Sequence, residues 1–346
     1  MPTTILQDTP PALVEGGGLH EGFFRTPFRR ANLLDADLMG GALARPLRWL
    51  RLKEWNGVGV GHPGLFGGIL HQDAKVAVSA TVYLYDREAD RMWEWTVLDR
   101  PRRRVLPETT WHGASRCGNA DRFLSLEHDL DHGRHRVRAR FPAGRGTPSV
   151  AVDLELRQDL REFQPLVFSL RIPPGHHTYT HKSPLRLDGT IDLGGRVFRF
   201  DPARDLGNLD EQKTFYPYRS HWLWGCFAGR SSAGREVVLN LVNQMTPKDL
   251  PGEDAMWLDG RLMLLPRPAF EPAGAPGHFR VRDPQGRVRL RFTPAGSKPE
   301  FRDFGLIRMD YRQFFGRWDG EVVDEDGLTH RIDGCFGCLE RMDARF

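Results

Sequence analysis

The densest group of chemically versatile side chains lies between residues 208 and 225, in the stretch NLDEQKTFYPYRSHWLWG. If 221–228 forms a strand, Trp222 and Trp224 share one face with Cys226, because successive strand residues point to opposite sides of a sheet. The segment before them adds two phenols, a guanidinium and a carboxylate, from Tyr216, Tyr218, Arg219 and Asp210. This mixture is typical of a pocket for a largely apolar ligand with a few polar anchors. The alternative is that the tryptophans belong to a barrel core and Asp210 to a turn.

Two other motifs could hold a metal ion. In a strand, His177, Tyr179 and His181 would share one face, but no carboxylate lies beside them at a ligand-like spacing. Cys335 and Cys338 have the C-x-x-C spacing without a second pair. We therefore expect no metal, and a polar loop explains the histidines, His176 included, equally well. A metal-dependent enzyme built around His177 and His181 is a weaker alternative.

The elements that must position these residues are strands. Residues alternate between apolar and polar over 150–157 and 287–292, and similar runs recur along the chain. Asp188-Gly189 and Asp259-Gly260 lie between such runs, where hairpin turns require positive φ. The sequence thus predicts an all-β protein with little helix. Such a chain must protect its sheet edges, and about eight strands per barrel would give two antiparallel β-barrels in tandem.

The expected organisation is a flexible N-terminal tail over 1–18, one barrel over 19–182 and a second over 183–346. Pro173-Pro174-Gly175 ends a strand-like run just before that boundary.

The composition and charge of the chain exclude several classes of function. The chain has 49 Lys+Arg against 45 Asp+Glu, so it is close to neutral over 346 residues. The arginines of 134–140 alternate with apolar residues, which predicts the wet face of a strand rather than a nucleic-acid site. There is no apolar run of the ~20 residues needed to cross a bilayer, no signal-peptide pattern at the start and no disulfide framework among four cysteines. We expect a cytoplasmic protein with no nucleic-acid partner and no integral membrane segment; its oligomeric state stays open.

Phosphate loops of the G-x-x-x-x-G-K-[ST] type and G-x-S-x-G nucleophile elbows do not occur, and no G-x-G-x-x-G lies between a strand and a helix. This argues against nucleotide-dependent and serine-hydrolase chemistry.

A series of short motifs carries a family resemblance. They are Leu52-Lys53-Glu54-Trp55, Tyr179-Thr180-His181-Lys182, the Pro-Tyr step before Trp222-Leu223-Trp224-Gly225, Val238-Leu239-Asn240-Leu241, Trp257-Leu258-Asp259-Gly260, Phe315–Gly320 and Gly334–Glu340. In this order they resemble the mainly bacterial domain-of-unknown-function family 2804. Glu211–Thr214 stands where that pattern has a Gly-rich step, and residues 340–346 lack its His and Trp.

The family is more distantly similar to tandem lipocalin-like (calycin) proteins that include carotenoid hydratases, tocopherol cyclases and some pericyclases. The resemblance implies two lipocalin-like β-barrels and a pocket for an apolar isoprenoid, polyketide or lipid-like ligand. It also makes Asn240 a candidate binding residue.

An enzyme of this kind would hydrate, cyclise or isomerise an alkene, as a hydratase, lyase or cyclase does. A carboxylic acid in an apolar surround can supply the proton, and indole and phenol faces stabilise a carbocation. No nucleotide, metal or other cofactor is needed. We predict Asp210 as the acid, with Glu340 second. The predicted lining residues are Tyr216, Tyr218, Trp222 and Trp224, with Arg219 or His221 anchoring a polar end.

The rival hypothesis is a non-catalytic carrier of a lipid or other small hydrophobic ligand. The same residues would then only line the cavity, and Arg219 or Lys182 would hold a carboxylate head group.

Overall fold

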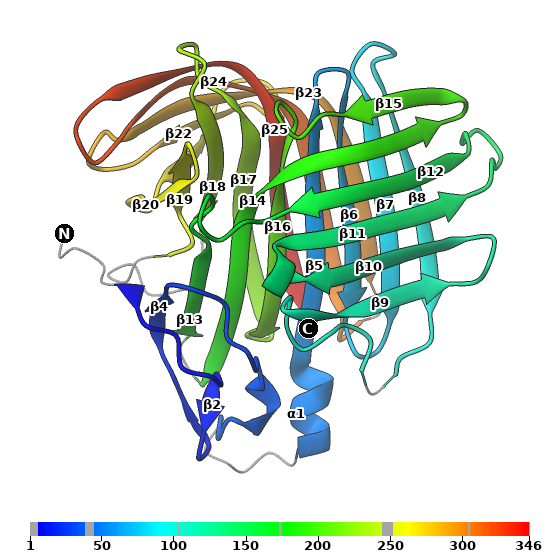
Figure 1. Ribbon diagram of the computed structural model, residues 1–346, viewed down its shortest axis with the longest axis vertical. Helices are drawn as coiled ribbons and strands as arrows, with labels where there is room; N and C mark the ends of the chain where they lie inside the picture. Colours follow the sequence, from blue (N-terminus) through cyan, green and yellow to red (C-terminus); the bar gives the residue numbers. More distant parts are fainter. Residues whose placement is uncertain are drawn as a thin grey trace. The chain divides into compact units, whose positions relative to one another are not determined.

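The computed structural model describes residues 6–38, 45–102, 104–172, 175–243, 252–303 and 305–345. Strands hold 64% of the residues and helices 4%, which confirms the predicted all-β class with little helix. The chain divides into two compact units (Figure 1). The N-terminal unit comprises Leu6–Arg171 and Gly175–Phe215, and the C-terminal unit starts at Tyr216.

The N-terminal unit is built from sixteen strands and three short helices among its described residues. The strands are β1 (Leu6–Gln7), β2 (Val14–Glu15), β3 (Gly18–Leu19), β4 (Gly22–Phe24), β5 (Leu52–His62), β6 (Leu65–Asp73), β7 (Val78–Asp86), β8 (Arg91–Asp99), β9 (His112–Gly118), β10 (Phe123–Asp129), β11 (Arg134–Phe141), β12 (Val150–Arg157), β13 (Leu166–Ile172), β14 (His176–Leu193), β15 (Arg196–Phe200) and β16 (Leu206–Phe215). The helices are α1 (Arg45–Arg51) and two 3-10 turns, η1 (Leu33–Asp35) and η3 (Leu130–His132).

The main sheet of this unit has the strand order β8-β7-β6-β5-β16-β14-β12-β11-β10-β9. Its two edge strands, β8 and β9, come into contact, so the sheet curls into a barrel around an apolar core. Strand β11 follows its pattern strictly: its four arginines are exposed, whereas His135, Val137, Ala139 and Phe141 are buried. The prediction that these arginines form a wet strand face is confirmed.

The N-terminal segment packs onto one end of this barrel. Leu13, Phe24 and Phe28 are buried with Leu52 of β5 and Phe215 of β16 in a separate apolar cluster. The expectation of a loose tail over 1–18 therefore does not describe residues 6–18, because Leu13 is fully buried there.

The C-terminal unit is a second, half-closed antiparallel sheet with the order β20-β19-β18-β17-β25-β24-β23-β22-β21. Its strands are β17 (Arg219–Arg230), β18 (Glu236–Asn243), β19 (Ala255–Leu258), β20 (Arg261–Leu264), β21 (Ala269–Pro272), β22 (Phe279–Arg282), β23 (Val288–Asp303), β24 (Arg308–Val323) and β25 (Thr329–Arg345). The first long strand pairs with the last, β17 with β25. One face of the sheet encloses an apolar core that includes Phe227, Phe292 and Trp318.

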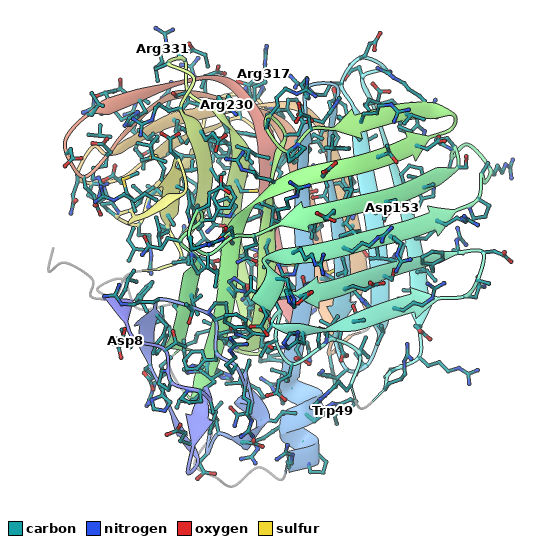
Figure 2. All side chains as sticks on the ribbon, in the orientation of Figure 1. Asp8, Trp49, Asp153, Arg230, Arg317 and Arg331 are labelled. Atoms are coloured by element: carbon teal, nitrogen blue, oxygen red, sulfur yellow. The ribbon has the colours of Figure 1, made fainter. Side chains whose placement is uncertain are left out.

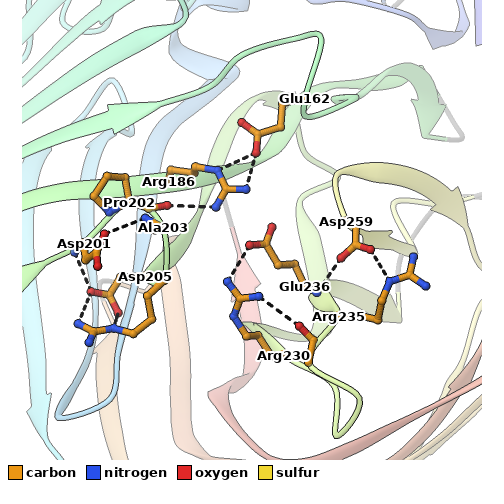
Figure 3. A network of polar contacts seen from close by, with 12 residues as sticks. Glu162, Arg186, Asp201, Pro202, Ala203, Asp205, Arg230, Arg235, Glu236 and Asp259 are labelled. Carbon is orange, nitrogen blue, oxygen red and sulfur yellow. Dashed lines mark hydrogen bonds and ion pairs between the residues drawn. The ribbon is translucent and has the colours of Figure 1, made fainter.

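One predicted turn is confirmed and another is wrong. Asp259 and Gly260 join β19 to β20 with φ of 46° and 82°, as a two-residue hairpin requires. The Asp259 carboxylate accepts a hydrogen bond from the Glu236 N–H and pairs with Arg235 (Figure 3). Asp188 and Gly189 instead lie inside β14, where Gly189 is opposite Leu154 of β12.

The expected boundary at 182/183 also falls inside β14, whereas the compact units divide between Phe215 and Tyr216. The domain ranges given above stay a prediction. None of the helices in the described part of the chain has the length and apolar character to cross a bilayer.

Candidate functional site

The structure separates the predicted site residues into two groups, one in each unit. Asp210 and Lys182 lie on β16 and β14 of the N-terminal unit, directly opposite each other, with Lys182 Nζ 3.1 Å from Asp210 Oδ2. Residues 206–215 are therefore a strand, and Asp210 does not lie in the turn that the sequence analysis gave as an alternative. The other eight residues, Tyr216, Tyr218, Arg219, His221, Trp222, Trp224, Asn240 and Glu340, belong to the C-terminal unit.

In the C-terminal unit Glu340 is held between two aromatic donors. The Trp222 indole N–H donates to Glu340 Oε1 at 2.8 Å, and the Tyr311 hydroxyl donates to Oε2 at 2.8 Å. The three residues come from β17, β25 and β24, which are adjacent in the sheet. All three side chains are partly exposed. The carboxylate thus has a fixed orientation on a surface that carries aromatic rings.

The second tryptophan of β17 continues this face. The Trp224 indole N–H donates to Asn240 Oδ1 at 2.7 Å, and the Asn240 amide donates to the Glu253 carbonyl at 2.6 Å. Tyr216 stacks on Trp222 with ring centroids 5.5 Å apart. The prediction that both tryptophans share a face is confirmed, but this face is opposite the apolar core of the unit, against which Leu223 packs.

Tyr218 takes a different place. It is exposed, and its hydroxyl donates to the Leu306 carbonyl at 2.8 Å.

Arg219 and His221 point to the other side of β17 and line a hollow with a volume of about 470 Å³. His221 Nδ1 lies 2.7 Å from Asp343 Oδ1. The remaining wall consists of Ser220, Arg308, Asp310, Arg341, Ala344 and Arg345. This hollow is polar, and neither tryptophan lines it. The strand alternation explains why, since it sends His221 and Trp222 to opposite faces. An apolar pocket lined by Trp222 or Trp224 stays a prediction.

Sequence reasoning missed a buried acid beside Asn240. Burial and the neighbouring Glu253 raise the pKa of Asp254 well above its ordinary value. Asp254 Oδ1 accepts the backbone N–H of Val242 at 2.7 Å, and the residue is fully buried. A single acid just before the apolar run Ala255–Leu258 gives no signal in the sequence that it is buried.

It also missed a buried polar layer inside the barrel of the N-terminal unit. Along the inner face of β5 the order is Leu52, Glu54, Asn56, Val58, so two polar residues lie between two apolar clusters. Strands β14 and β16 repeat this order: Tyr179, His181, Ser183, Leu185 and Phe215, Lys213, Glu211, Leu209. The layer is covered by apolar residues on both sides.

Hydrogen bonds link the layer into a chain. His181 Nδ1 lies 3.1 Å from Thr110 Oγ1 and 3.2 Å from Glu211 Oε2, and its Nε2 lies 2.9 Å from the Gln158 amide. The Gln158 oxygen is 2.9 Å from His135, whose Nδ1 is 3.0 Å from His128. Burial lowers the pKa of His135 to about 4 and that of His128 well below its usual range.

An ion-pair cluster completes the layer. Burial alone would oppose ionisation of Glu54, but Lys213 at 2.8 Å and Lys75 lower its pKa to about 2. Because most of these groups are paired with one another and are almost wholly buried, we interpret the layer as a structural network. His181, a candidate metal ligand from the sequence, belongs to it, and His177 lies 2.7 Å from Ser169 Oγ.

The chain thus belongs to the class of all-β proteins with two curled antiparallel sheets. The second sheet carries the Glu340 carboxylate together with the side chains of Trp222 and Tyr311. A model of the family described as a domain of unknown function, DUF2804, matches residues 5–346, and the chain belongs to this family. No curated protein matches it significantly.

Three solved structures are similar to this chain. A Nitrosomonas europaea protein provisionally described as AttH has a TM-score of 0.51 and 16% identity over 88% of this chain and 97% of its own. Kievitone hydratase from Nectria haematococca has a TM-score of 0.49 and 9% identity, and CghA 0.49 and 13%; both cover 85% of this chain and 88% of their own. At these identities the similarity concerns the fold alone.

Proposed function

We propose that the protein is an enzyme that acts on an apolar small molecule by proton transfer, as in the hydration, cyclisation or isomerisation of an alkene, without a bound cofactor. The observation that supports it is the Glu340 carboxylate, fixed by the Trp222 and Tyr311 donors at 2.8 Å each. A group that gives or takes a proton in a transition state must be held in a defined direction.

The aromatic rings around Glu340 suit the same chemistry. Protonating an alkene creates a cation, and indole and phenol faces attract cations through their ring quadrupoles. Trp222 and Trp224 bring two partly exposed rings beside the carboxylate, each oriented by a hydrogen bond, and the buried Tyr216 stacks on Trp222. Substrate would lie against these rings with its reacting carbon near Glu340.

Of the two acids predicted from the sequence, Glu340 is the better supported. One oxygen of Asp210 is committed to Lys182, and Asp210 lies in the N-terminal unit on a strand flanked by β5 and β14. Both remain candidates, and matched variants distinguish them.

The experiment starts from protein purified from its own host, with native mass spectrometry and lipid extraction to identify a co-purifying apolar molecule. Turnover of that molecule is then measured for Glu340→Gln, Asp210→Asn and, as a control, Glu321→Gln, a half-buried glutamate of β24 paired with Arg289. We expect turnover to fall by roughly 10²–10⁴ for Glu340→Gln, with affinity within a few-fold, and to stay unchanged for the other two.

If Asp210→Asn loses activity and Glu340→Gln retains it, Glu340 is the wrong acid. Should a ligand bind tightly and leave chemically unchanged under all conditions, the protein is a carrier and the enzyme proposal fails. Tyr311→Phe removes one hydrogen-bond donor to Glu340 and leaves the charge of Glu340 in place. It gives a second variant to measure if Glu340→Gln does not fold.

A further inference from the structure

Three arginines lie side by side at one end of the C-terminal sheet. In the strand register Arg345 of β25 is directly opposite Arg219 of β17 on one side and Arg308 of β24 on the other. Directly opposite residues in adjacent antiparallel strands have their Cβ atoms about 5 Å apart, and like charges in such pairs are destabilising. All three arginines line the hollow of about 470 Å³.

The carboxylates nearby do not neutralise this row. Asp343 is shared by His221 at 2.7 Å and Arg341 at 3.1 Å, and Asp310 lies 3.6 Å from Arg341. Asp303 approaches Arg345 only to 4.0 Å. Among the described residues, Arg219 and Arg308 have no ion-pair partner. The hollow therefore carries two guanidinium groups that form no ion pair within the described part of the chain, and such groups are planar donors suited to bidentate binding of a carboxylate or phosphate.

Two rows of mainly charged residues follow the arginine row on this face, with Arg341 directly opposite Leu223 and Arg312, and apolar residues come farther along. Leu223 lies four residues along β17 from Arg219, and Phe314 follows on β24; both pack against the apolar core. Phe301 of β23 is opposite Asp310 and is 56% exposed, with the Arg308 guanidinium 5.3 Å from its ring centroid. A ligand bound at the arginines would have the exposed Phe301 ring beside it.

We propose that this hollow binds an amphipathic organic anion, with its carboxylate or phosphate group between Arg219, Arg345 and Arg308 and its apolar part against Phe301. The inference does not rest on the proposed enzyme activity, because Glu340 and the tryptophans lie on the opposite face of the sheet. A volume of about 470 Å³ is within the usual range of roughly 300–1,000 Å³ for small-molecule sites.

The test is isothermal titration calorimetry on the full chain with octanoate and octyl phosphate, and with octanol and inorganic phosphate for comparison. The variant is the double substitution Arg219→Gln and Arg308→Gln. The control is Arg317→Gln, because Arg317 is an exposed arginine of the same unit that does not line the hollow (Figure 2). We expect saturable binding of at least one octyl anion, weakened about tenfold or more in the double variant and unchanged in the control. Raising the salt concentration should also weaken it.

The head group is identified by which octyl anion binds more tightly. Absence of saturable binding by both anions, or equal affinity in the double variant, would overturn the proposal. Octanol binding as tightly as the anions would contradict the role of the arginines, and inorganic phosphate binding as tightly as octyl phosphate would contradict the apolar part. Arg308→Gln alone gives a milder second variant if the double substitution disturbs folding. Glu340→Gln should leave anion affinity unchanged, which separates this test from that of the enzyme.

Discussion

Low pH should reduce the stability of the N-terminal unit, because the fold keeps several buried histidines neutral. The contribution of His71 can be measured separately from those of the other histidines. His71 lies on β6, is fully buried, and its Nδ1 is 2.9 Å from Ser115 Oγ. Burial lowers its pKa to about 4, with Arg102 contributing in the same direction, whereas no other histidine takes part in the shift. It is therefore a simpler probe than His128 and His135, which affect each other.

The sign of the effect follows from where the proton binds. Above pH 6.5 the imidazole is neutral in both states, so folding is unaffected. As the pH falls from 6.5 toward 4, the unfolded chain takes up a proton that the folded chain does not, and stability is lost. With pKa values of about 4 folded and 6.5 unfolded, the loss from this one residue at pH 5 is about 2 kcal/mol relative to pH 7.5.

The perturbation is His71→Gln, measured at pH 7.5 and pH 5. At pH 7.5 the variant should be less stable by about 1 kcal/mol through weaker hydrogen bonding with Ser115. At pH 5 the wild type has lost a further ~2 kcal/mol that the variant cannot lose, so the order should be reversed. The control is His132→Gln, since the His132 side chain is 69% exposed.

Because the chain has two units, the assay must report on the N-terminal one. Hydrogen exchange by mass spectrometry across a urea gradient, followed on peptides from residues 65–86, gives the free energy of unfolding for that unit alone. If wild type and His71→Gln lose the same stability between pH 7.5 and pH 5, His71 is not held neutral and the reasoning is refuted.

Two further predictions concern the C-terminal unit. Asp254→Asn should leave stability at pH 7–8 unchanged or raise it, because burial raises the pKa of Asp254 and an ionised carboxylate there is unfavourable; a loss above 1 kcal/mol in urea unfolding would contradict this. Gly337→Ala should cost more than about 2 kcal/mol, since a Cβ would lie 2.1 Å from the Cys226 carbonyl, whereas Gly144→Ala, with nothing within 4 Å, should have little effect; thermal melting compares the two.

The local features of this fold could be read from the sequence because they depend on neighbouring residues. Alternation gave the strands, as at β11 and β12, and the Asp259-Gly260 pair gave a hairpin. It also placed Trp222 and Trp224 on one face. Which face points to the core could not be read, since Leu223 and Trp224 are both large and apolar and either could pack inside.

The candidate site could be predicted only in part because most of it is assembled from distant strands. Asp343 and Tyr311 reach His221 and Glu340 through the pairing of β17, β25 and β24, which no local pattern encodes. The polar layer was hidden for a different reason. Glu211 and Lys213 alternate as residues on a solvent-exposed face do, yet both faces of β16 are largely buried. Their burial is offset because Lys213 pairs with Glu54, which also pairs with Lys75, and because Glu211 lies 3.2 Å from His181.

The register between β17 and β25 determines both faces of the C-terminal sheet at once. It sets Trp224 opposite Glu340 on one side and His221 opposite Asp343 on the other. If β25 shifted by one residue relative to β17, its side chains would move to the opposite face of the sheet, and both pairings would be lost. Two glycines oppose such a slip: a Cβ on Gly225 would lie 2.7 Å from Trp318, and one on Gly337 would meet the Cys226 carbonyl. Only glycine fits where these strands pass so close. The two glycines therefore help to hold the register that places Glu340 opposite Trp224 and Arg345 opposite Arg219.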